Sequence, residues 1–115
     1  MQRFLVAVAM MLMPALVALL PVGAAHAAPC SRHVKSLNSN TPVTVTFLNK
    51  SGEFRGVKWV DFKGKWVSYA KLNPGQSYTV NTYATHPWVF TDGNGHCVEM
   101  WVTRAGVSKF KITAK

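Results

Sequence analysis

The stretch from Asn49 to Trp88 concentrates side chains that can bind a peptide through aromatic faces. It contains three of the four tryptophans and all three tyrosines of the chain, and it ends in His86-Pro87-Trp88. Aromatic faces suit the flat, weakly polar pyrrolidine ring, and proline-rich ligands are pre-organised, so docking them costs little conformational entropy. Tryptophan in a small β-domain more often lies in the core, and we expect Trp66 and Trp101 there.

Residues with catalytic potential form no recognisable pattern. The sequence has no G-x-S-x-G, no glycine-rich phosphate loop and no H-E-x-x-H. Asp92 is expected to form a turn within Asp92-Gly93-Asn94-Gly95. A thiol nucleophile or a metal site could use Cys97 with His96, but neither has a further partner at a ligand spacing. We therefore expect a non-enzymatic protein with no catalytic residues, no metal and no cofactor.

Beyond residue 40 the apolar residues recur with a period near two, which is typical of β-strands. Turn sequences rich in glycine, asparagine and proline interrupt the pattern at about 8 to 12 residues. Strands are predicted over 43–48, 57–62, 66–69, 77–82, 88–91, 97–103 and 107–112. The pattern predicts an all-β fold, a seven-stranded antiparallel β-sandwich.

Residues 1–27 have the three parts of an export signal. Arg3 supplies a positive charge, residues 4–20 are apolar, and Ala25-His26-Ala27 has the small residues that a signal peptidase recognises. Cleavage after Ala27 would leave an extended lead-in over 28–41 and the sandwich over 42–115. A retained membrane anchor is the alternative, because the apolar run is near the lower limit for spanning a bilayer. We expect a periplasmic or secreted protein.

The two cysteines, Cys30 and Cys97, both lie in the expected mature part. An oxidising compartment permits a disulfide between them, and a domain of this size often needs such a covalent link. In the chain-entropy model the closed loop would stabilise the fold by roughly 4 kcal/mol. The sequence therefore predicts a Cys30–Cys97 disulfide.

Thirteen Lys and Arg against four Asp and Glu give a formal net charge of +9. Lys109 and Lys111 alternate with Phe110 and Ile112, so both lysines should face solvent from one strand. The basic residues form either a solvated, edge-protecting surface or one that attracts an anionic envelope surface or polysaccharide. Nucleic acid is not expected as a partner of an exported protein, and a monomer is expected.

The aromatic stretch resembles the β domain of the von Hippel–Lindau (VHL) family, over about residues 43–112. The shared residues, in the same order and at matching separations, are Asn49-Lys50-Ser51, Asp61-Phe62-Lys63-Gly64 after a tryptophan, Tyr69, Leu72, Pro74-Gly75, Thr82-Tyr83 and His86-Pro87-Trp88. The resemblance implies a seven-stranded sandwich that recognises 4-hydroxyproline in a peptide.

The resemblance also implies ligand-binding roles for five residues. Trp59 would form an aromatic wall, Tyr69 would line the pocket and bond the peptide backbone, and Trp88 would pack on the pyrrolidine ring. Thr82 and His86 would bond the ligand hydroxyl, because a threonine hydroxyl donates and accepts while a neutral imidazole can do either. A site built to bond a hydroxyl rejects the analogue that lacks it.

Three features depart from the family pattern. Thr82 replaces a serine and adds a methyl group, Asn81 replaces a histidine, and the sequence ends at Lys115 directly after the last predicted strand. The helical domain that recruits ubiquitin-ligase subunits, and those partners, are therefore not expected.

We therefore predict an exported module that binds an extended proline- or hydroxyproline-containing peptide. The alternative, based on the charge, is a structural or envelope-associated scaffold whose basic surface binds anionic cell-surface polymers.

Overall fold

The computed structural model describes residues 30–115, so the predicted export signal lies outside the described residues. The strands are β1 (Pro42–Asn49), β2 (Arg55–Val60), β3 (Trp66–Leu72), β4 (Ser77–Tyr83), β5 (Pro87–Thr91), β6 (Cys97–Val102) and β7 (Lys109–Ile112). In this part of the chain no helix is long and apolar enough to cross a membrane.

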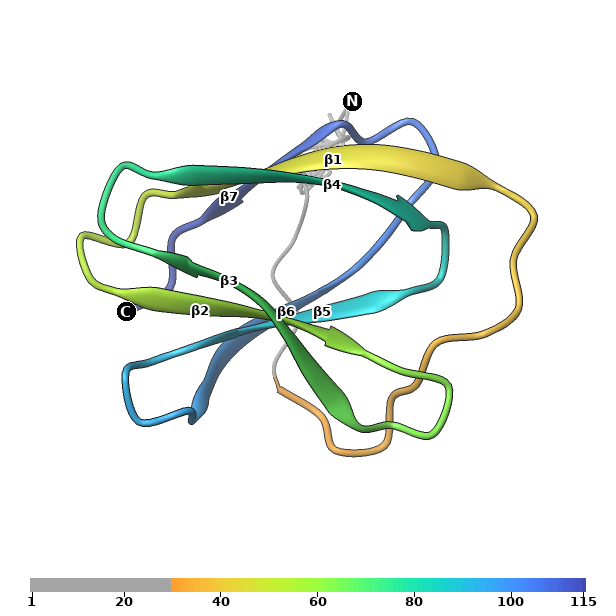
Figure 1. The fold of residues 1–115 in the computed structure, drawn as a ribbon, viewed down its shortest axis with the longest axis horizontal. Helices are drawn as coiled ribbons and strands as arrows, with labels where there is room; N and C mark the ends of the chain where they lie inside the picture. Colours follow the sequence, from red (N-terminus) through yellow and green to blue (C-terminus); the bar gives the residue numbers. More distant parts are fainter. Residues whose placement is uncertain (1–29) are drawn as a thin grey trace, which may run out of the picture.

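The seven strands form two sheets, which lie as two layers in Figure 1. One sheet has the order β4-β1-β7 and the other the order β3-β2-β5-β6. The predicted all-β, two-sheet architecture is confirmed, but the prediction of purely antiparallel pairing is wrong. β7 pairs with β1 in parallel, with Phe110 opposite Phe47. The chain crosses from one layer to the other between β6 and β7, so no hairpin joins β7 to β1 and nothing forces them to run in opposite directions.

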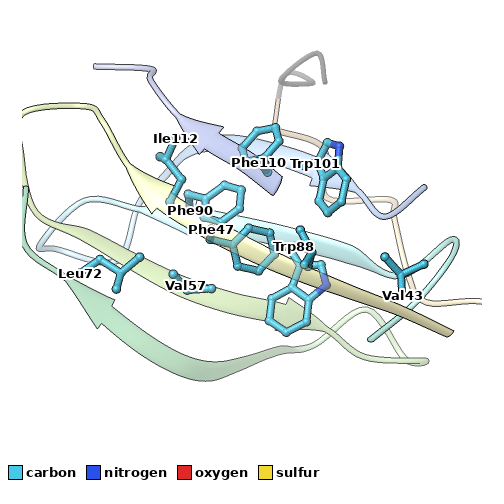
Figure 2. Packing of buried hydrophobic residues seen from close by; sticks show 10 residues of the cluster. Val43, Phe47, Val57, Leu72, Trp88, Phe90, Trp101, Phe110 and Ile112 are labelled. Carbon is cyan, nitrogen blue, oxygen red and sulfur yellow. The ribbon is translucent and has the colours of Figure 1, made fainter. Parts of the chain in front are cut away.

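The core lies between the two sheets and is centred on Phe47 of β1. The centre of the Phe47 ring lies 5.2 Å from the ring centre of Trp88, 5.1 Å from that of Phe90, 6.0 Å from that of Trp101 and 6.4 Å from that of Phe110. These tilted and edge-to-face arrangements are the ones that aromatic pairs prefer. Figure 2 shows the rings between the strands of the two layers.

Two predicted burial patterns can be compared with this core. Trp101 is buried as expected, and in β7 Phe110 and Ile112 are buried while Lys109 and Lys111 are exposed. Trp66, however, is 38 % exposed, so its prediction as a core residue is wrong. It begins the edge strand β3 and lines a hollow with residues of the lead-in and of the β5–β6 loop, rather than facing the other sheet.

Strand β2 ends at Val60, two residues earlier than predicted, because Asp61 forms a turn. Oδ1 of Asp61 accepts hydrogen bonds from the backbone N–H groups of Lys63 and Lys65, each at 2.8 Å. The bond from Lys65 is the main cause of a lowered Asp61 pKa. This turn leaves Phe62 exposed at its tip.

Residues 30–41 contain no strand and lie against the outer face of the four-stranded sheet. The predicted disulfide is confirmed: Cys30 is bonded to Cys97 at the start of β6. Val34 packs on a small apolar cluster on this face formed by Val60, Val89 and Met100. The disulfide and this cluster therefore fix the lead-in to the sheet.

Two further contacts tie the lead-in to the turns at the end of the sandwich. Ser36 is buried, and its hydroxyl donates to the Val60 carbonyl at 2.6 Å while its N–H donates to the Asp61 carbonyl at 3.1 Å. The Leu37 carbonyl accepts a hydrogen bond from the Thr85 hydroxyl at 3.2 Å. The lead-in thus contacts both turns that flank the site described next.

Candidate functional site

All five residues predicted to bind ligand line one pocket of about 250 Å³. Trp59 comes from β2, Tyr69 from β3, Thr82 from β4 and Trp88 from β5, while His86 precedes β5. The pocket lies where β3 and β4, one edge strand from each sheet, come together. Edge strands have backbone groups that are not paired within their own sheet.

A β-bulge places Tyr69 in the pocket. Val57 of β2 pairs with Ala70 and the next residue, Lys58, pairs with Ser68, so Tyr69 has no partner in the ladder. A bulge changes the direction of a side chain. Here the centre of the Tyr69 ring lies 5.1 Å from that of Trp88 and 6.3 Å from that of Trp59. Trp59 and Trp88 are directly opposite each other in β2 and β5, which brings the three rings together.

The β4–β5 turn that carries His86 is tightly held. Among the described residues, Thr85 is the one non-glycine residue with a positive φ, at 80°, a conformation that a β-branched residue rarely adopts. The turn is fixed by Thr103, whose N–H and hydroxyl both donate to the His86 carbonyl, at 3.0 and 2.7 Å. The backbone at His86 is therefore positioned before any ligand arrives.

The His86 imidazole is enclosed by aromatic rings. Its centre lies 5.7 Å from that of Trp59, 5.3 Å from Phe62 and 5.5 Å from Tyr83. This burial lowers the pKa of His86 below its ordinary value, and the backbone of Leu37 opposes the shift only in part. The lowered pKa favours the neutral imidazole. A neutral imidazole has one N–H donor and one acceptor nitrogen.

Thr82 supplies the complementary donor. The indole Nε1 of Trp88 donates to the Thr82 hydroxyl oxygen at 3.3 Å, so the hydroxyl hydrogen remains free to donate elsewhere. Thr82 and His86 are both buried and both line the pocket. Together they offer one donor and one acceptor, the pair that a ligand hydroxyl requires.

A family model, the VHL beta domain, matches residues 34–104, which is more than half of the chain. The chain belongs to the VHL β-domain family. The VHL match begins within the lead-in and includes β1–β6 and all five pocket residues. The VHL β domain is a substrate-binding module rather than an enzyme domain, and in VHL itself it recognises hydroxyproline.

Trp88 differs from the simplest expectation for a VHL-type pocket residue. It is almost completely buried and packs on Phe47 in the core, while part of its ring lines the pocket. Core and pocket roles are therefore combined in one side chain, and its removal would disturb both.

Three pocket residues were not predicted as ligand-binding residues, namely Phe62, Asn81 and Tyr83. Phe62 and Tyr83 are about half exposed, and the ring of each packs against the His86 ring. Asn81 accepts from Thr44 through Oδ1 at 2.8 Å, which leaves its amide hydrogens for other partners. The sequence signal for Phe62 was its place in the Asp61 turn, where an aromatic residue has no core to fill.

The alternative sites around Cys97 and His96 are not supported in the VHL-type domain. Cys97 is consumed in the disulfide, so in this structure it is neither a thiol nucleophile nor a metal ligand. Asp92 forms the predicted turn, with Oδ1 accepting from the N–H groups of Asn94 and His96 at 2.9 Å each. Residues 30–115 contain no group of three His, Cys, Asp or Glu side chains placed to share a metal ion.

The burial of His86 predicts a loss of stability as the pH falls from 7 to 5. In the unfolded chain the pKa of His86 is near 6.5, whereas in the folded domain desolvation lowers it. Between these two pKa values the unfolded state binds more protons, so the free energy of unfolding decreases as the pH falls through this interval. Asp61 and Asp92, whose pKa values are lowered from 3.8, act in a more acidic range.

Urea unfolding at pH 7, 6 and 5 measures this effect. The His86→Gln variant should show a flatter pH profile than the unmodified protein. The exposed His33, replaced in the same way, provides the control and should leave the profile unchanged. An identical slope in the His86→Gln variant would contradict the assignment.

Proposed function

We propose that the protein is an exported, non-enzymatic binding module whose pocket takes a proline or 4-hydroxyproline ring of an extended peptide. One observation carries the proposal: the Thr82 hydroxyl, whose oxygen already accepts from Trp88, and the buried His86 imidazole line one pocket walled by aromatic rings. The rings of Trp59, Tyr69 and Trp88 suit the pyrrolidine ring, and the polar pair suits a hydroxyl on it.

The position of the pocket supports binding of an extended peptide rather than of a small molecule. It lies between two edge strands, β3 and β4, and Tyr69 and Tyr83 stand exposed at its rim. A peptide that enters between these tyrosines can place one ring inside while its backbone continues over the strand edges. A pre-organised proline-rich ligand loses little entropy in doing so.

The proposal predicts a preference for a hydroxylated peptide, measured by calorimetric titration of the disulfide-bonded protein. Two peptides are compared, identical except for proline or 4-hydroxyproline at one position. The hydroxylated peptide should bind about tenfold or more tightly, because the other would leave Thr82 and His86 unpaired. The preference should disappear in His86→Ala and persist in the control His33→Ala.

A second pair of variants separates the hydroxyl contact from the shape of the pocket. Thr82→Val keeps the volume and removes the hydroxyl, so it should lose the preference, whereas Thr82→Ser should retain it. Equal affinity for the two peptides would reduce the site to a proline pocket. No heat with either peptide would contradict the proposal.

A further inference from the structure

A second hollow crosses the outer face of the four-stranded sheet, away from the core. One part, of about 500 Å³, is lined by Lys58, Lys71 and Ser68, and another, of about 660 Å³, by Arg32, Trp66 and His96. Gly95 lines both parts. Lys58 of the first part and Trp66 of the second are also neighbours, with the Lys58 ammonium group 6.0 Å from the centre of the Trp66 ring. We call the combined hollow the basic groove.

Four residues that line the basic groove are glycines. Gly56 lies in β2, while Gly64 lies in the β2–β3 turn and Gly93 and Gly95 lie in the β5–β6 turn. A Cβ atom at Gly56 would come within 2.5 Å of the Thr91 hydroxyl oxygen, so the close approach of β2 and β5 requires glycine there. Hydroxyl groups of Ser31, Ser68 and Thr91 also line the groove. A hydroxyl-rich ring would therefore find polar side-chain partners in the groove.

The charge of the basic groove is not balanced. Lys58, Lys71 and Arg32 line it, and Asp92 is the one carboxylate among its lining residues. Both oxygens of Asp92 have local partners, since Oδ1 accepts from two backbone N–H groups and Oδ2 lies 3.5 Å from Nδ1 of His96. The groove therefore presents positive charge to an incoming ligand, which agrees with the net charge of +9.

Trp66 is the feature of the groove that distinguishes acidic polysaccharides from other anionic ligands. It is an exposed tryptophan whose ring is contacted by a lysine, and such a ring can stack on the C–H face of a sugar. Aspartate and glutamate side chains of an acidic peptide would satisfy the lysines but have no ring face to place on the exposed Trp66. We infer that the basic groove binds an acidic polysaccharide, with one sugar ring on Trp66 and its anionic groups paired with Lys58, Lys71 and Arg32.

The basic groove is separate from the pocket that contains Thr82 and His86, which we call the proline pocket after its proposed ligand. The two hollows have a single lining residue in common, Tyr69. The inference goes beyond the proposed function and does not depend on it. Its test uses a hexasaccharide of galacturonic acid and, as the matched uncharged probe, the methyl ester of the same hexasaccharide. Binding to the disulfide-bonded protein is measured by calorimetry at low ionic strength and again at higher ionic strength, where screening weakens surface charge pairs.

The expected result is binding of the acid, little binding of the ester, and about a tenfold loss of affinity in Trp66→Ala. Tyr83→Ala, which removes an exposed aromatic ring outside the groove, is the matched control and should bind normally. Lys58→Gln should weaken binding several-fold, whereas Lys109→Gln, on the other sheet, should not. His86→Ala should also bind normally, which separates this site from the proline pocket.

Three results would overturn the inference. If the hexasaccharide of galacturonic acid does not bind, the basic groove is not a site for acidic polysaccharides. Equal losses in Lys58→Gln and Lys109→Gln, with none in Trp66→Ala, would indicate diffuse attraction to the whole basic surface. Binding of hexaglutamate as tight as that of the hexasaccharide, and equally sensitive to Trp66→Ala, would assign the groove to acidic peptides.

Discussion

Removal of the Cys30–Cys97 disulfide is expected to lower the free energy of unfolding by roughly 4 kcal/mol. The two cysteines are 67 residues apart in the sequence, so the bond closes a long loop and restricts the unfolded chain strongly. A small domain has only about 5–15 kcal/mol of stability. The double variant Cys30→Ser/Cys97→Ser should therefore unfold at a much lower urea concentration than the oxidised protein.

The same variant is expected to lose preference for the hydroxylated peptide while it is still folded. The disulfide anchors the segment that carries Ser36 to the Asp61 turn and the Leu37 carbonyl to the β4–β5 turn. Without this anchor the hydrogen bond from the Thr85 hydroxyl to the Leu37 carbonyl, which ties the residue before His86 to the lead-in, is no longer held. Peptide titration at low temperature, where circular dichroism verifies folding, measures this effect.

A variant with the disulfide intact separates the two consequences. Ser36→Ala removes the hydrogen bond to the Val60 carbonyl and should weaken the preference for hydroxyproline partly, with a smaller loss of stability of about 1 kcal/mol. If the folded double variant keeps the full preference, the lead-in supports only the fold and has no part in positioning His86.

The strands were predictable because each has a local signal. Alternation of Val43, Val45 and Phe47 with polar residues predicts a strand with one buried face, and the structure has that face in the core. Pairing had no such signal. The parallel β1–β7 contact joins residues more than 60 positions apart, and nothing in the 107–112 pattern indicates its direction. The prediction that Trp66 is a core residue was wrong for a related reason, because composition does not show which strand forms the edge of a sheet.

The pocket was predictable only in part, through family resemblance rather than through pattern. The structure brings all five named residues together, but it does so through tertiary contacts. The bulge that turns Tyr69 inward depends on the register between β2 and β3. The Leu37 carbonyl reaches Thr85, the residue before His86, because a disulfide near the other end of the lead-in fixes the segment. Long-range constraints of this kind leave no periodic trace in the sequence.

The basic groove illustrates the same limit for charge. The lysines look evenly spread in the sequence, and an evenly solvated surface was one reasonable interpretation. Folding places Lys58 and Lys71 on one sheet face and the disulfide holds Arg32 at its end. Trp66 then lies among cations instead of in the core, which changes an unremarkable basic surface into a candidate site.

Replacement of Asn49 is expected to destabilise the domain about as much as loss of the disulfide. Its side chain is fully buried at the end of β1. Nδ2 donates to the carbonyls of Glu53 and Leu72 at 2.7 and 3.0 Å, while Oδ1 accepts from the N–H and the hydroxyl of Ser51 at 3.1 and 2.7 Å. At about 1 kcal/mol for each bond, Asn49→Ala should cost about 4 kcal/mol of unfolding free energy.

A nearly isosteric variant shows whether hydrogen bonding or volume causes this loss. Asn49→Asp keeps the shape but replaces the donor with an anionic oxygen that faces two carbonyl groups, so it should be at least as destabilising as Asn49→Ala. Asn40→Ala, at an exposed position, is the matched control and should change stability by less than about 0.5 kcal/mol. Urea unfolding of the three variants measures the differences. A mild effect of Asn49→Asp would mean that the end of β1 is held by its backbone pairing with β4 and β7, and that the buried amide only fills space.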